Sequence, residues 1–274
     1  MDDTYTHGHH ESVLRSHRWR TAENSAAYLL DRLRPGQDLL DVGCGPGTIT
    51  LDLAARVAPG RVVGIDSSEV VLAAARASVT GAGPTNVSFV TGDAYHLQFD
   101  EGTFDVAHAH QVLQHLSSPV SALAEMARVL RPGGTLAVRD SDYGGFVWAP
   151  ADPVLSRWLS LYHEITAHNG ADADAGRHLP AWVREAGFEE ARVTTSTWTF
   201  ADPDSRAWWG GLWADRVERS AFAEQALAYA LSDAEELSAI ARAWRRWVEQ
   251  PDGFFAVLHT EVLAIRPGPA TPTR

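Results

Sequence analysis

The chain contains a single cysteine, Cys44, among its 274 residues. No disulfide bond can therefore form within the chain, which favours a reducing compartment such as the cytoplasm. Long apolar runs are also missing, and the first residues lack the charged stretch followed by a hydrophobic one that marks a secretion signal. The sequence therefore predicts a soluble, cytoplasmic protein without a membrane partner.

Positive charge is the second scarce feature. Lysine and arginine together number 23 against 35 aspartates and glutamates, which gives a formal net charge of −12. Nucleic-acid binding depends on clustered basic side chains that face phosphates, so a nucleic-acid partner is not expected. Hydrophobic residues make up 45% of the chain, enough for the core of one large α/β domain or of a domain with an added lid.

The most informative motif occupies residues 39–54. The Leu-Leu-Asp-Val segment at 39–42 is typical of a short buried strand, glycines follow at alternate positions, and a helix is predicted from Ile49. A strand, a tight glycine turn and a helix N-terminus form a backbone that can lie flat against a nucleotide-like ligand. Asp41 precedes the first glycine and could meet a cation there. Cys44 stands inside the turn, where we interpret it as a small residue that fits rather than as a nucleophile.

Strands and helices then alternate along the chain. Further strands are predicted over 61–66, 87–90 and 104–110, and after the Leu-Arg-Pro-Gly-Gly turn at 130–134. This alternation predicts a parallel sheet with helices on both faces. Asp66 ends the second strand, where a carboxylate can accept hydrogen bonds from both hydroxyls of a ribose. Helix starts are marked by Ser118, Asp152 and Asp202, each followed by proline, and by a capping box of Ser232 with Glu235.

Residues 38–139 resemble the class I S-adenosylmethionine (SAM)-dependent methyltransferases, in particular the UbiE-like members that act on small molecules. The resemblance implies a doubly wound, Rossmann-like α/β fold with a seven-stranded sheet in the order 3-2-1-4-5-7-6. The last two strands, over 188–200 and 254–265, would form an antiparallel hairpin at the sheet edge. It also implies SAM as cofactor, with contacts from Asp41, Gly43, Cys44, Gly45, Asp66, Ser67, Asp93, Ala94, His110 and Gln111. In this resemblance Asp93 and Ala94 meet the adenine, and His110 faces the methionine part.

Other interpretations of the glycine turn stay open. An NAD-dependent oxidoreductase also begins with a strand, a glycine turn and a helix, but its glycines are spaced G-x-G-x-x-G, whereas Pro46 interrupts this turn. SAM-using enzymes that do not methylate, such as a decarboxylase, hydroxylase or cyclase, are built on the same fold. A SAM-binding protein without catalysis is disfavoured, because the acids of the turn and of the second strand are both present.

The chain divides into four predicted parts. Residues 1–36 form a helical lid segment, 37–200 with 252–266 form the core, 201–251 form a helical insertion that serves as a substrate lid, and 267–274 are a flexible tail. Nine of the ten tryptophans follow residue 147, which suggests an aromatic-walled cavity over the cofactor. We therefore expect in-line methyl transfer to O, N or C of a small aromatic or heterocyclic metabolite. The acceptor and the oligomeric state stay open, a homodimer being one arrangement.

Candidate catalytic residues follow the fourth and fifth strands, because ligands of a doubly wound sheet bind beyond the carboxyl ends of its strands. His115 is the candidate proton acceptor, since histidine titrates near neutral pH, and it would otherwise shape the pocket. Asp140 could hold an acceptor amine or hydroxyl, and Tyr143 follows in the same loop. Tyr5 and the segment 17–19 are expected to close over the cofactor.

Three histidines near the start of the chain, His7, His9 and His10, could place ring nitrogens close together and so suggest a metal. No Cys-x-x-Cys or His-Glu-x-x-His motif accompanies them in the sequence. We therefore predict no functional metal.

Overall fold

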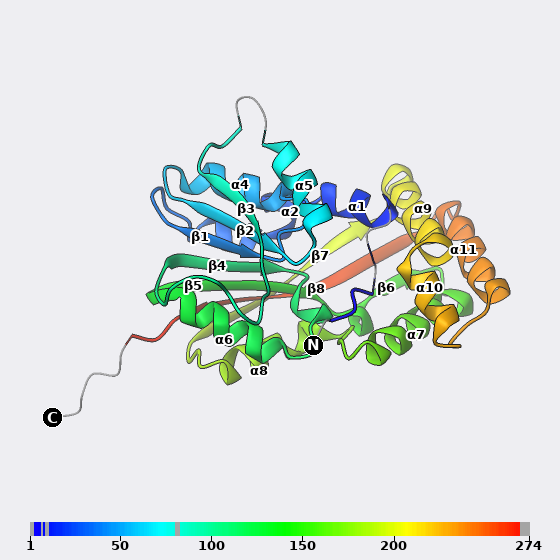
Figure 1. Ribbon diagram of the computed structural model, residues 1–274. Coiled ribbons are helices and arrows are strands. Elements are labelled where there is room, and N and C mark those ends of the chain that lie inside the picture. The colour runs from blue at the N-terminus through cyan, green and yellow to red at the C-terminus, as the bar shows by residue number, and fades with distance from the viewer. Residues whose placement is uncertain (1–2, 7, 9–10, 80–82, 269–274) are drawn as a thin grey trace.

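A mainly parallel β-sheet forms the centre of the protein, with helices on both of its faces (Figure 1). The computed structural model describes residues 3–6, 8, 11–79 and 83–268, and the histidines considered as metal ligands, His7, His9 and His10, lie outside them. The five parallel strands are β1 (Leu39–Val42), β2 (Val62–Asp66), β3 (Val87–Thr91), β4 (Phe104–His110) and β5 (Leu130–Ser141). Their order, 3-2-1-4-5, is the predicted one.

The other edge of the sheet is antiparallel. β8 (Phe254–Ile265) pairs on one side with β5 and on the other with β7 (Ala191–Phe200), which confirms the predicted closing hairpin. One additional short strand, β6 (Val147–Ala149), was not predicted and also pairs with β8. β8 accommodates it because its first residues extend beyond the end of β5.

The helices of the core follow from their apolar faces. α4 (Thr48–Val57) and α5 (Glu69–Ser78) follow β1 and β2, α6 (Pro119–Val129) precedes β5, and α8 (Ala175–Glu185) precedes β7. Each turns a hydrophobic stripe toward the sheet, and Leu53, Leu72, Leu123 and Leu179 on these four helices are fully buried. This packing leaves the carboxyl ends of the parallel strands free to form a site.

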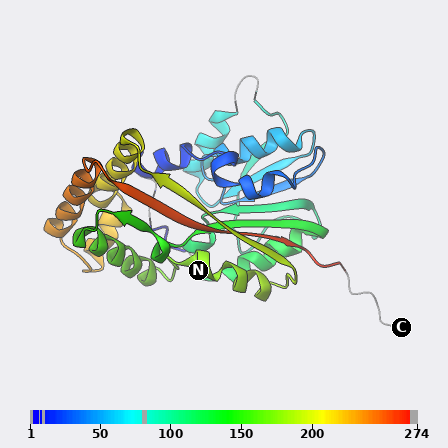
Figure 2. The same cartoon turned by 180° about the vertical axis from the view of Figure 1, so that it is seen from behind.

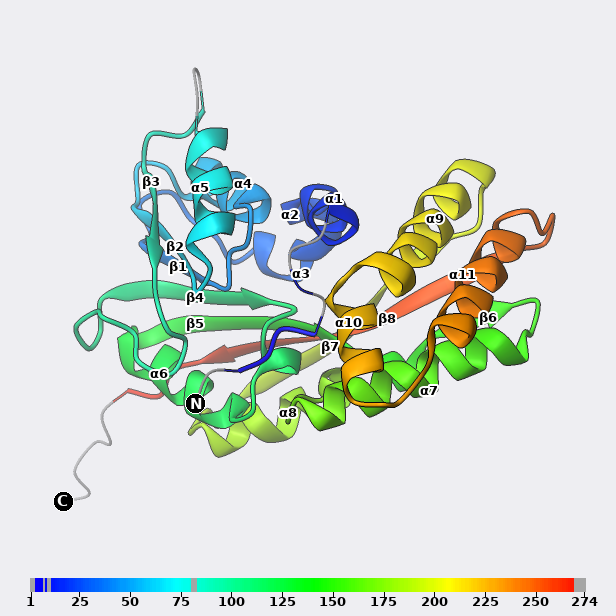
Figure 3. The same cartoon turned by 45° about the vertical axis from the view of Figure 1, so that its right-hand side comes forward.

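Two further helical groups complete the protein (Figure 3), and in the first of them Ala22 and Leu29 are fully buried against the sheet. α1 (Glu11–Arg18), α2 (Ala22–Ser25) and α3 (Ala27–Leu30) precede β1, whereas α7 (Pro153–His168), α9 (Pro203–Arg219), α10 (Ala221–Ala228) and α11 (Ala234–Val248) surround the far end of the β7–β8 hairpin. Figure 2 shows this long hairpin running from the core to α9 and α11. Trp158, Trp213 and Trp244 are fully buried among these helices and form a second hydrophobic core.

Aspartates mark the starts of three outer helices. Asp152 and Asp202 cap α7 and α9 as predicted, each accepting a backbone N–H. The start of α11 differs by one residue, because Asp233 accepts the N–H of Glu236 at 2.8 Å while the Ser232 hydroxyl donates to the Glu236 carboxylate at 2.6 Å. Aspartate caps a helix as well as serine does, so the predicted capping box was wrong in its register. Among the described residues, no helix is long and apolar enough to cross a membrane.

Candidate active site

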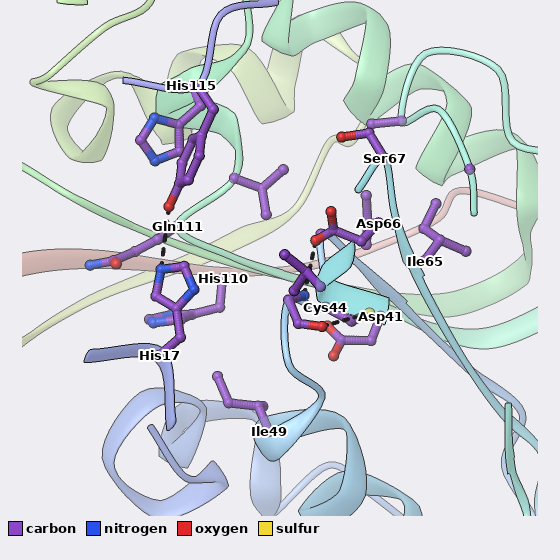
Figure 4. A pocket seen from close by; sticks show the side chains of 18 of the residues that line it. His17, Asp41, Cys44, Ile49, Ile65, Asp66, Ser67, His110, Gln111 and His115 are labelled. Carbon is purple, nitrogen blue, oxygen red and sulfur yellow. Dashed lines mark hydrogen bonds between the residues drawn. The ribbon is translucent and has the colours of Figure 1, made fainter. Parts of the chain in front are cut away.

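A cavity of about 500 Å³ lies at the carboxyl ends of the parallel strands, beside the glycine turn that follows β1 (Figure 4). All the residues predicted to contact a cofactor line it: Asp41, Gly43, Cys44, Gly45, Asp66, Ser67, Asp93, Ala94, His110 and Gln111. They follow four different strands, whose ends the sheet order brings together. A cavity of this size is typical of sites for small-molecule cofactors.

The glycine turn requires glycine for two physical reasons. Gly43 and Gly47 have φ angles of +66° and +80°, in the left-handed region that side chains disfavour. A Cβ on Gly43 would lie 2.3 Å from Val112 Cγ2, and one on Gly47 would lie 2.6 Å from Phe89 Cζ. The backbone therefore faces the cavity directly, next to the N-terminus of α4. Burial raises the pKa of the Cys44 thiol, which agrees with its interpretation as a non-nucleophilic residue.

Asp41 is held by partners inside the protein. Its Oδ1 accepts from Nδ1 of His108 at 2.7 Å and its Oδ2 accepts the Thr50 hydroxyl at 2.5 Å. His108 is fully buried and lies directly opposite Asp41 in the pairing of β1 with β4. His108 was not predicted as a site residue, although the register of the parallel strands would have placed it there. Asp41 therefore positions the start of the glycine turn, and only 3% of it is exposed.

Asp66 is fixed by two backbone N–H groups at the end of β2. Gly45 donates to its Oδ2 at 3.0 Å and Ser68 donates to its Oδ1 at 2.9 Å. The first of these bonds ties the glycine turn to β2. Each carboxylate oxygen can accept a second hydrogen bond, so Asp66 keeps acceptor sites for the two hydroxyls of a ribose.

Asp93 follows β3, the strand at the edge of the sheet, just as Asp66 ends the neighbouring strand β2. It accepts the Tyr95 N–H at 2.9 Å and lies 3.1 Å from Nδ1 of His96. Partial burial raises the pKa of Asp93, but the Tyr95 and His96 hydrogen bonds outweigh it, and the pKa falls below its ordinary value. Asp93 is therefore ionised at neutral pH and can accept a hydrogen bond from an amino group such as that of adenine.

Gln111 joins three distant parts of the chain. Its φ of +54° is uncommon for a residue with a side chain. Its side-chain oxygen accepts from Arg20 Nη2 at 2.5 Å, and its amide nitrogen donates to His259 Nε2 at 2.8 Å. Arg20 and His259 are 91 and 148 residues away in the chain, so no local pattern could have revealed them. These contacts hold the strained residue at the cavity wall.

His110, the last residue of β4, and His115, which follows this strand, are both neutral. Burial, together with repulsion from Arg139, holds the pKa of His110 well below its ordinary value, and burial with repulsion from Arg20 lowers the pKa of His115 to about 3. The ring of His115 meets the Tyr5 ring edge-on, with centroids 4.7 Å apart. An imidazole with so low a pKa is a weak proton acceptor, because general bases work best near the operating pH. The geometry favours a role for His115 in shaping the cavity.

The other two candidate catalytic residues lie outside the large cavity. Asp140 is fully buried, accepts the N–H of Gln114 at 3.2 Å, and has its pKa raised to about 7 by burial. Tyr143 lines a smaller cavity of about 30 Å³, where its ring stacks on Tyr162 with centroids 3.8 Å apart. The structure therefore does not bring His115, Asp140 and Tyr143 together at one point.

The smaller cavity has mostly aromatic walls. They are formed by Trp19, Tyr143, Phe146, Trp198, Trp208 and Trp209. His17, Arg20 and Gln111 line both cavities, which are therefore adjacent. Three of the nine tryptophans predicted for an aromatic cavity, Trp198, Trp208 and Trp209, line it together with Trp19, whereas Trp158 and others pack in the second core.

The N-terminal segment lies against the large cavity. Figure 4 shows His17, Gln111 and His115 on one side of it and Asp41 with Asp66 on the other. The Tyr5 hydroxyl is 3.3 Å from His17 Nε2. Two residues before Tyr5, the Asp3 carboxylate accepts hydrogen bonds from the Ser117 N–H at 3.2 Å and from the Tyr95 hydroxyl at 2.5 Å. These contacts hold the segment that was expected to close over a cofactor, and Asp3 is a lining residue that was not predicted.

Known proteins resemble this chain in both sequence and fold. A family model described as a methyltransferase domain matches residues 40–138. An uncharacterized methyltransferase of Schizosaccharomyces pombe is 33% identical over 267 residues, covering 94% of this chain and 95% of that protein. Nocamycin O-methyltransferase of Saccharothrix syringae is 33% identical over 212 residues, covering 69% of this chain and 73% of that protein. The crystal structure of the YcgJ protein of Bacillus subtilis shares the fold, with a TM-score of 0.60 at 19% identity over 90% of this chain and 100% of that one.

A parallel sheet in the order 3-2-1-4-5, a glycine turn after β1 and an acid at the tip of β2 define a Rossmann-like nucleotide-binding protein. Within that class, the chain belongs to the class I SAM-dependent methyltransferases. The resemblance of its motifs to this family is thereby confirmed, and the NAD-dependent interpretation is set aside.

Proposed function

We propose that this enzyme transfers the methyl group of SAM to an oxygen atom of a small aromatic or heterocyclic molecule. The observation that carries the proposal is the adjacency of the two cavities. The larger one has the glycine turn and the acids suited to SAM, and the smaller one has aromatic walls suited to a planar acceptor. A relative that covers two thirds of the chain, nocamycin O-methyltransferase, supports oxygen as the acceptor atom rather than nitrogen or carbon.

The residues of the large cavity fit SAM in both shape and charge. Asp66 and Asp93 would accept hydrogen bonds from the ribose hydroxyls and the adenine amino group, while the glycine turn leaves room for the chain that joins ribose and methionine. Arg20 is the single arginine among the described residues that line this cavity, so it would pair with the methionine carboxylate. Arg20 reaches this place because Gln111 accepts its Nη2 hydrogen bond.

The chain contributes mainly alignment and exclusion of water. SAM, when bound, supplies a methyl group already activated by its positively charged sulfur. Gln111, held by Arg20 and His259, stands where an acceptor in the smaller cavity would face the cofactor site. A fixed geometry at this border lowers the entropic cost of an in-line attack. If the acceptor oxygen carries a proton, His17, the histidine that lines both cavities, is placed to receive it.

Of the two segments predicted as lids, residues 11–20 and 201–251 would act together over the acceptor. Three contacts support this arrangement. Arg216 in α9 donates to the Ser16 hydroxyl at 3.2 Å, Arg15 Nη2 lies 3.9 Å from Asp215 Oδ2, and the ring centres of Trp19 and Trp208 are 5.1 Å apart. Opening of the lid would separate these pairs and admit the acceptor.

Calorimetric titration with SAM and S-adenosylhomocysteine tests the cofactor. Asp66→Ala should weaken SAM binding by about 1–3 kcal/mol, because the charge-assisted hydrogen bonds to ribose are lost. Asp252→Ala is the matched control, since Asp252 is exposed and lines neither cavity. Unchanged SAM affinity in Asp66→Ala would remove Asp66 from the site, and no SAM binding by the natural protein would contradict the proposal.

The mass of the product then separates methyl transfer from the other reactions built on this fold. A methyltransferase adds one CH2 to its acceptor, whereas a decarboxylase, hydroxylase or cyclase does not. Screening phenols and heterocyclic alcohols with SAM by mass spectrometry should therefore give products one CH2 heavier, together with S-adenosylhomocysteine. Conversion of an acceptor without that gain would favour one of the non-methylating alternatives.

A further inference from the structure

The smaller cavity is positively charged although the protein as a whole carries a net charge of −12. Two arginines, Arg20 and Arg216, line it together with aromatic and neutral polar side chains, and no aspartate or glutamate of the described chain does. Local charge at this cavity is therefore opposite to that of the whole molecule. Such a reversal needs a physical reason, because a buried cation is costly unless something compensates it.

Arg216 lacks a counter-charge within the described part of the protein. It is 4% exposed, and among the described residues its Nη2 donates only to neutral oxygens, the Ser16 hydroxyl at 3.2 Å and the Ser12 carbonyl at 3.4 Å. Its guanidinium carbon lies 4.6 Å from the centre of the Trp213 ring, a contact that holds the side chain without neutralising it. Among the described residues, Arg216 forms an ion pair with no carboxylate.

The titratable groups around Arg216 do not neutralise its charge either. Burial lowers its pKa, and the neighbours that raise it again are the phenols of Tyr143, Tyr5 and Tyr162. Burial raises the pKa of Tyr5 to about 12, and the pKa values of the other two phenols are also raised, so none of them is an anion at neutral pH. The Arg20 and Arg216 guanidinium groups also repel each other, and this repulsion lowers the pKa of Arg20.

Unused hydrogen-bond donors accompany this uncompensated charge. Arg216 Nε, Arg20 Nε and Trp209 Nε1 are buried and have no hydrogen-bond partner in the described structure. Buried donors without partners are rare in proteins and call for an explanation. All three belong to side chains that line the smaller cavity, so a ligand that supplies anionic oxygen would satisfy donors and charge together.

We propose, on the basis of the methyltransferase function above, that the acceptor is an aromatic anion whose carboxylate or phenolate oxygen is bound by Arg216. Its ring would pack among Trp198, Trp208 and Trp209. Arg20, at the border of the two cavities, would remain the partner of the SAM carboxylate, so each arginine meets one anion. A planar guanidinium matches carboxylate geometry and also tolerates aromatic neighbours.

Trp19 is the side chain that must move to admit such an acceptor. A volume of about 30 Å³ holds about one water molecule, far less than an aromatic ring needs. Trp19 is 37% exposed and its ring centre lies 5.2 Å from that of Trp198 and 5.1 Å from that of Trp208. Rotation of Trp19 toward solvent would therefore open the cavity on its aromatic side while leaving Arg216 in place.

An anionic acceptor also explains how methyl transfer proceeds beside so weak a base as His115. A lone pair of the ionised oxygen forms the new bond to the methyl carbon as the carbon–sulfur bond breaks, and the electron pair of that bond stays on sulfur. The products are the methyl ester or ether and S-adenosylhomocysteine. No proton has to leave in this step, because the acceptor oxygen is already ionised.

Calorimetric titration of the protein saturated with S-adenosylhomocysteine tests the inference. The probes are benzoate, its neutral analogue benzamide, and 4-nitrophenolate at a pH where it is ionised. We expect benzoate or 4-nitrophenolate to bind at least tenfold more tightly than benzamide, and the stronger of the two identifies the anionic group. Equal binding of anions and benzamide, or binding of none of the probes, would overturn the inference.

Variants of Arg216 assign the preference to its charge. Arg216→Gln should abolish the preference for the anion and leave the affinity for S-adenosylhomocysteine unchanged, because Arg216 does not line the large cavity. Arg216→Lys should retain part of it, and Arg219→Gln, an exposed arginine of the same helix, should retain all of it. An anion preference that survives Arg216→Gln would refute the role of Arg216. If the natural protein does not bind S-adenosylhomocysteine at all, that result would instead contradict the proposed function itself.

Discussion

Charged side chains at the active site divide between its two cavities. Asp41, Asp66 and Asp93 line the larger cavity, whereas Arg216 lines only the smaller one. In the proposed complex Asp66 and Asp93 would bind the ribose and the adenine of SAM, whereas Arg216 would bind an anionic acceptor. Arg20 stands between them and, through Gln111, links the two halves of the site. This distribution of charge would favour different ligands in the two cavities.

The glycine turn offers a prediction at the scale of single residues. Gly47 and Gly133 have nearly equal φ angles, +80° and +79°, but a Cβ on Gly47 would lie 2.6 Å from Phe89 whereas a Cβ on Gly133 meets nothing within 4 Å. Gly133→Ala should therefore cost about 1 kcal/mol from backbone strain alone. Gly47→Ala should cost about 1–3 kcal/mol more, because it also overpacks the core. Urea unfolding measures both, and equal losses would contradict the steric argument.

Among the helices and strands, those set by local signals could be predicted from the sequence, whereas those set by long-range contacts could not. The starts of α6, α7 and α9 were predictable because proline fits the first turn of a helix. Asp152 and Asp202 also cap α7 and α9, whereas the Ser118 side chain makes no cap hydrogen bond to α6. β6 was not predictable, because three residues are too few to show a period and its partner β8 lies about a hundred residues later. The pairing of Asp41 with His108 likewise depends on the register of β1 against β4.

The cap of α11 can be tested directly. Asp233→Ala should destabilise the protein by about 0.5–2 kcal/mol, because it removes the hydrogen bond to the Glu236 N–H. Ser232→Ala, the residue expected to cap from the sequence, should have a smaller effect, since its hydroxyl contacts only a side chain and the Asp233 carbonyl. Thermal unfolding of the two variants compares them, and a larger loss in Ser232→Ala would favour Ser232 as the cap.

At the scale of the whole molecule, buried ionisable groups set the response to pH. His110, His115 and His259 have pKa values lowered by burial, so between those values and about 6.5 the unfolded chain binds more protons and stability rises with pH. Asp140 acts in the opposite direction. Its pKa is raised to about 7 by burial, so the folded protein binds the extra proton between about pH 4 and 7, and stability falls as pH rises through that range.

The balance of these terms predicts a maximum of stability. Each group contributes up to about 1.4 kcal/mol per pH unit, so three histidines outweigh one aspartate below pH 6.5. We expect the free energy of unfolding to rise from pH 5 to about 6.5 and to rise no further by pH 7. Urea unfolding across this range measures it, with Asp140→Asn as the variant in which the rise should be steeper. Equal or greater stability at pH 5 than at pH 6.5 would contradict the account.

The sequence by itself determined the fold and the cofactor side of the site. Glycine turns, strand-ending acids and helix caps act over a few residues, and parallel strands carry their carboxyl ends to one edge, so local patterns were enough to place Asp66 and Asp93. The smaller, aromatic cavity, by contrast, depends on tertiary contacts. Gln111 contacts Arg20 and His259, and Arg216 contacts Ser16, across up to about two hundred residues of chain. Burial, which no local pattern encodes, sets the ionisation of His115 and Asp140.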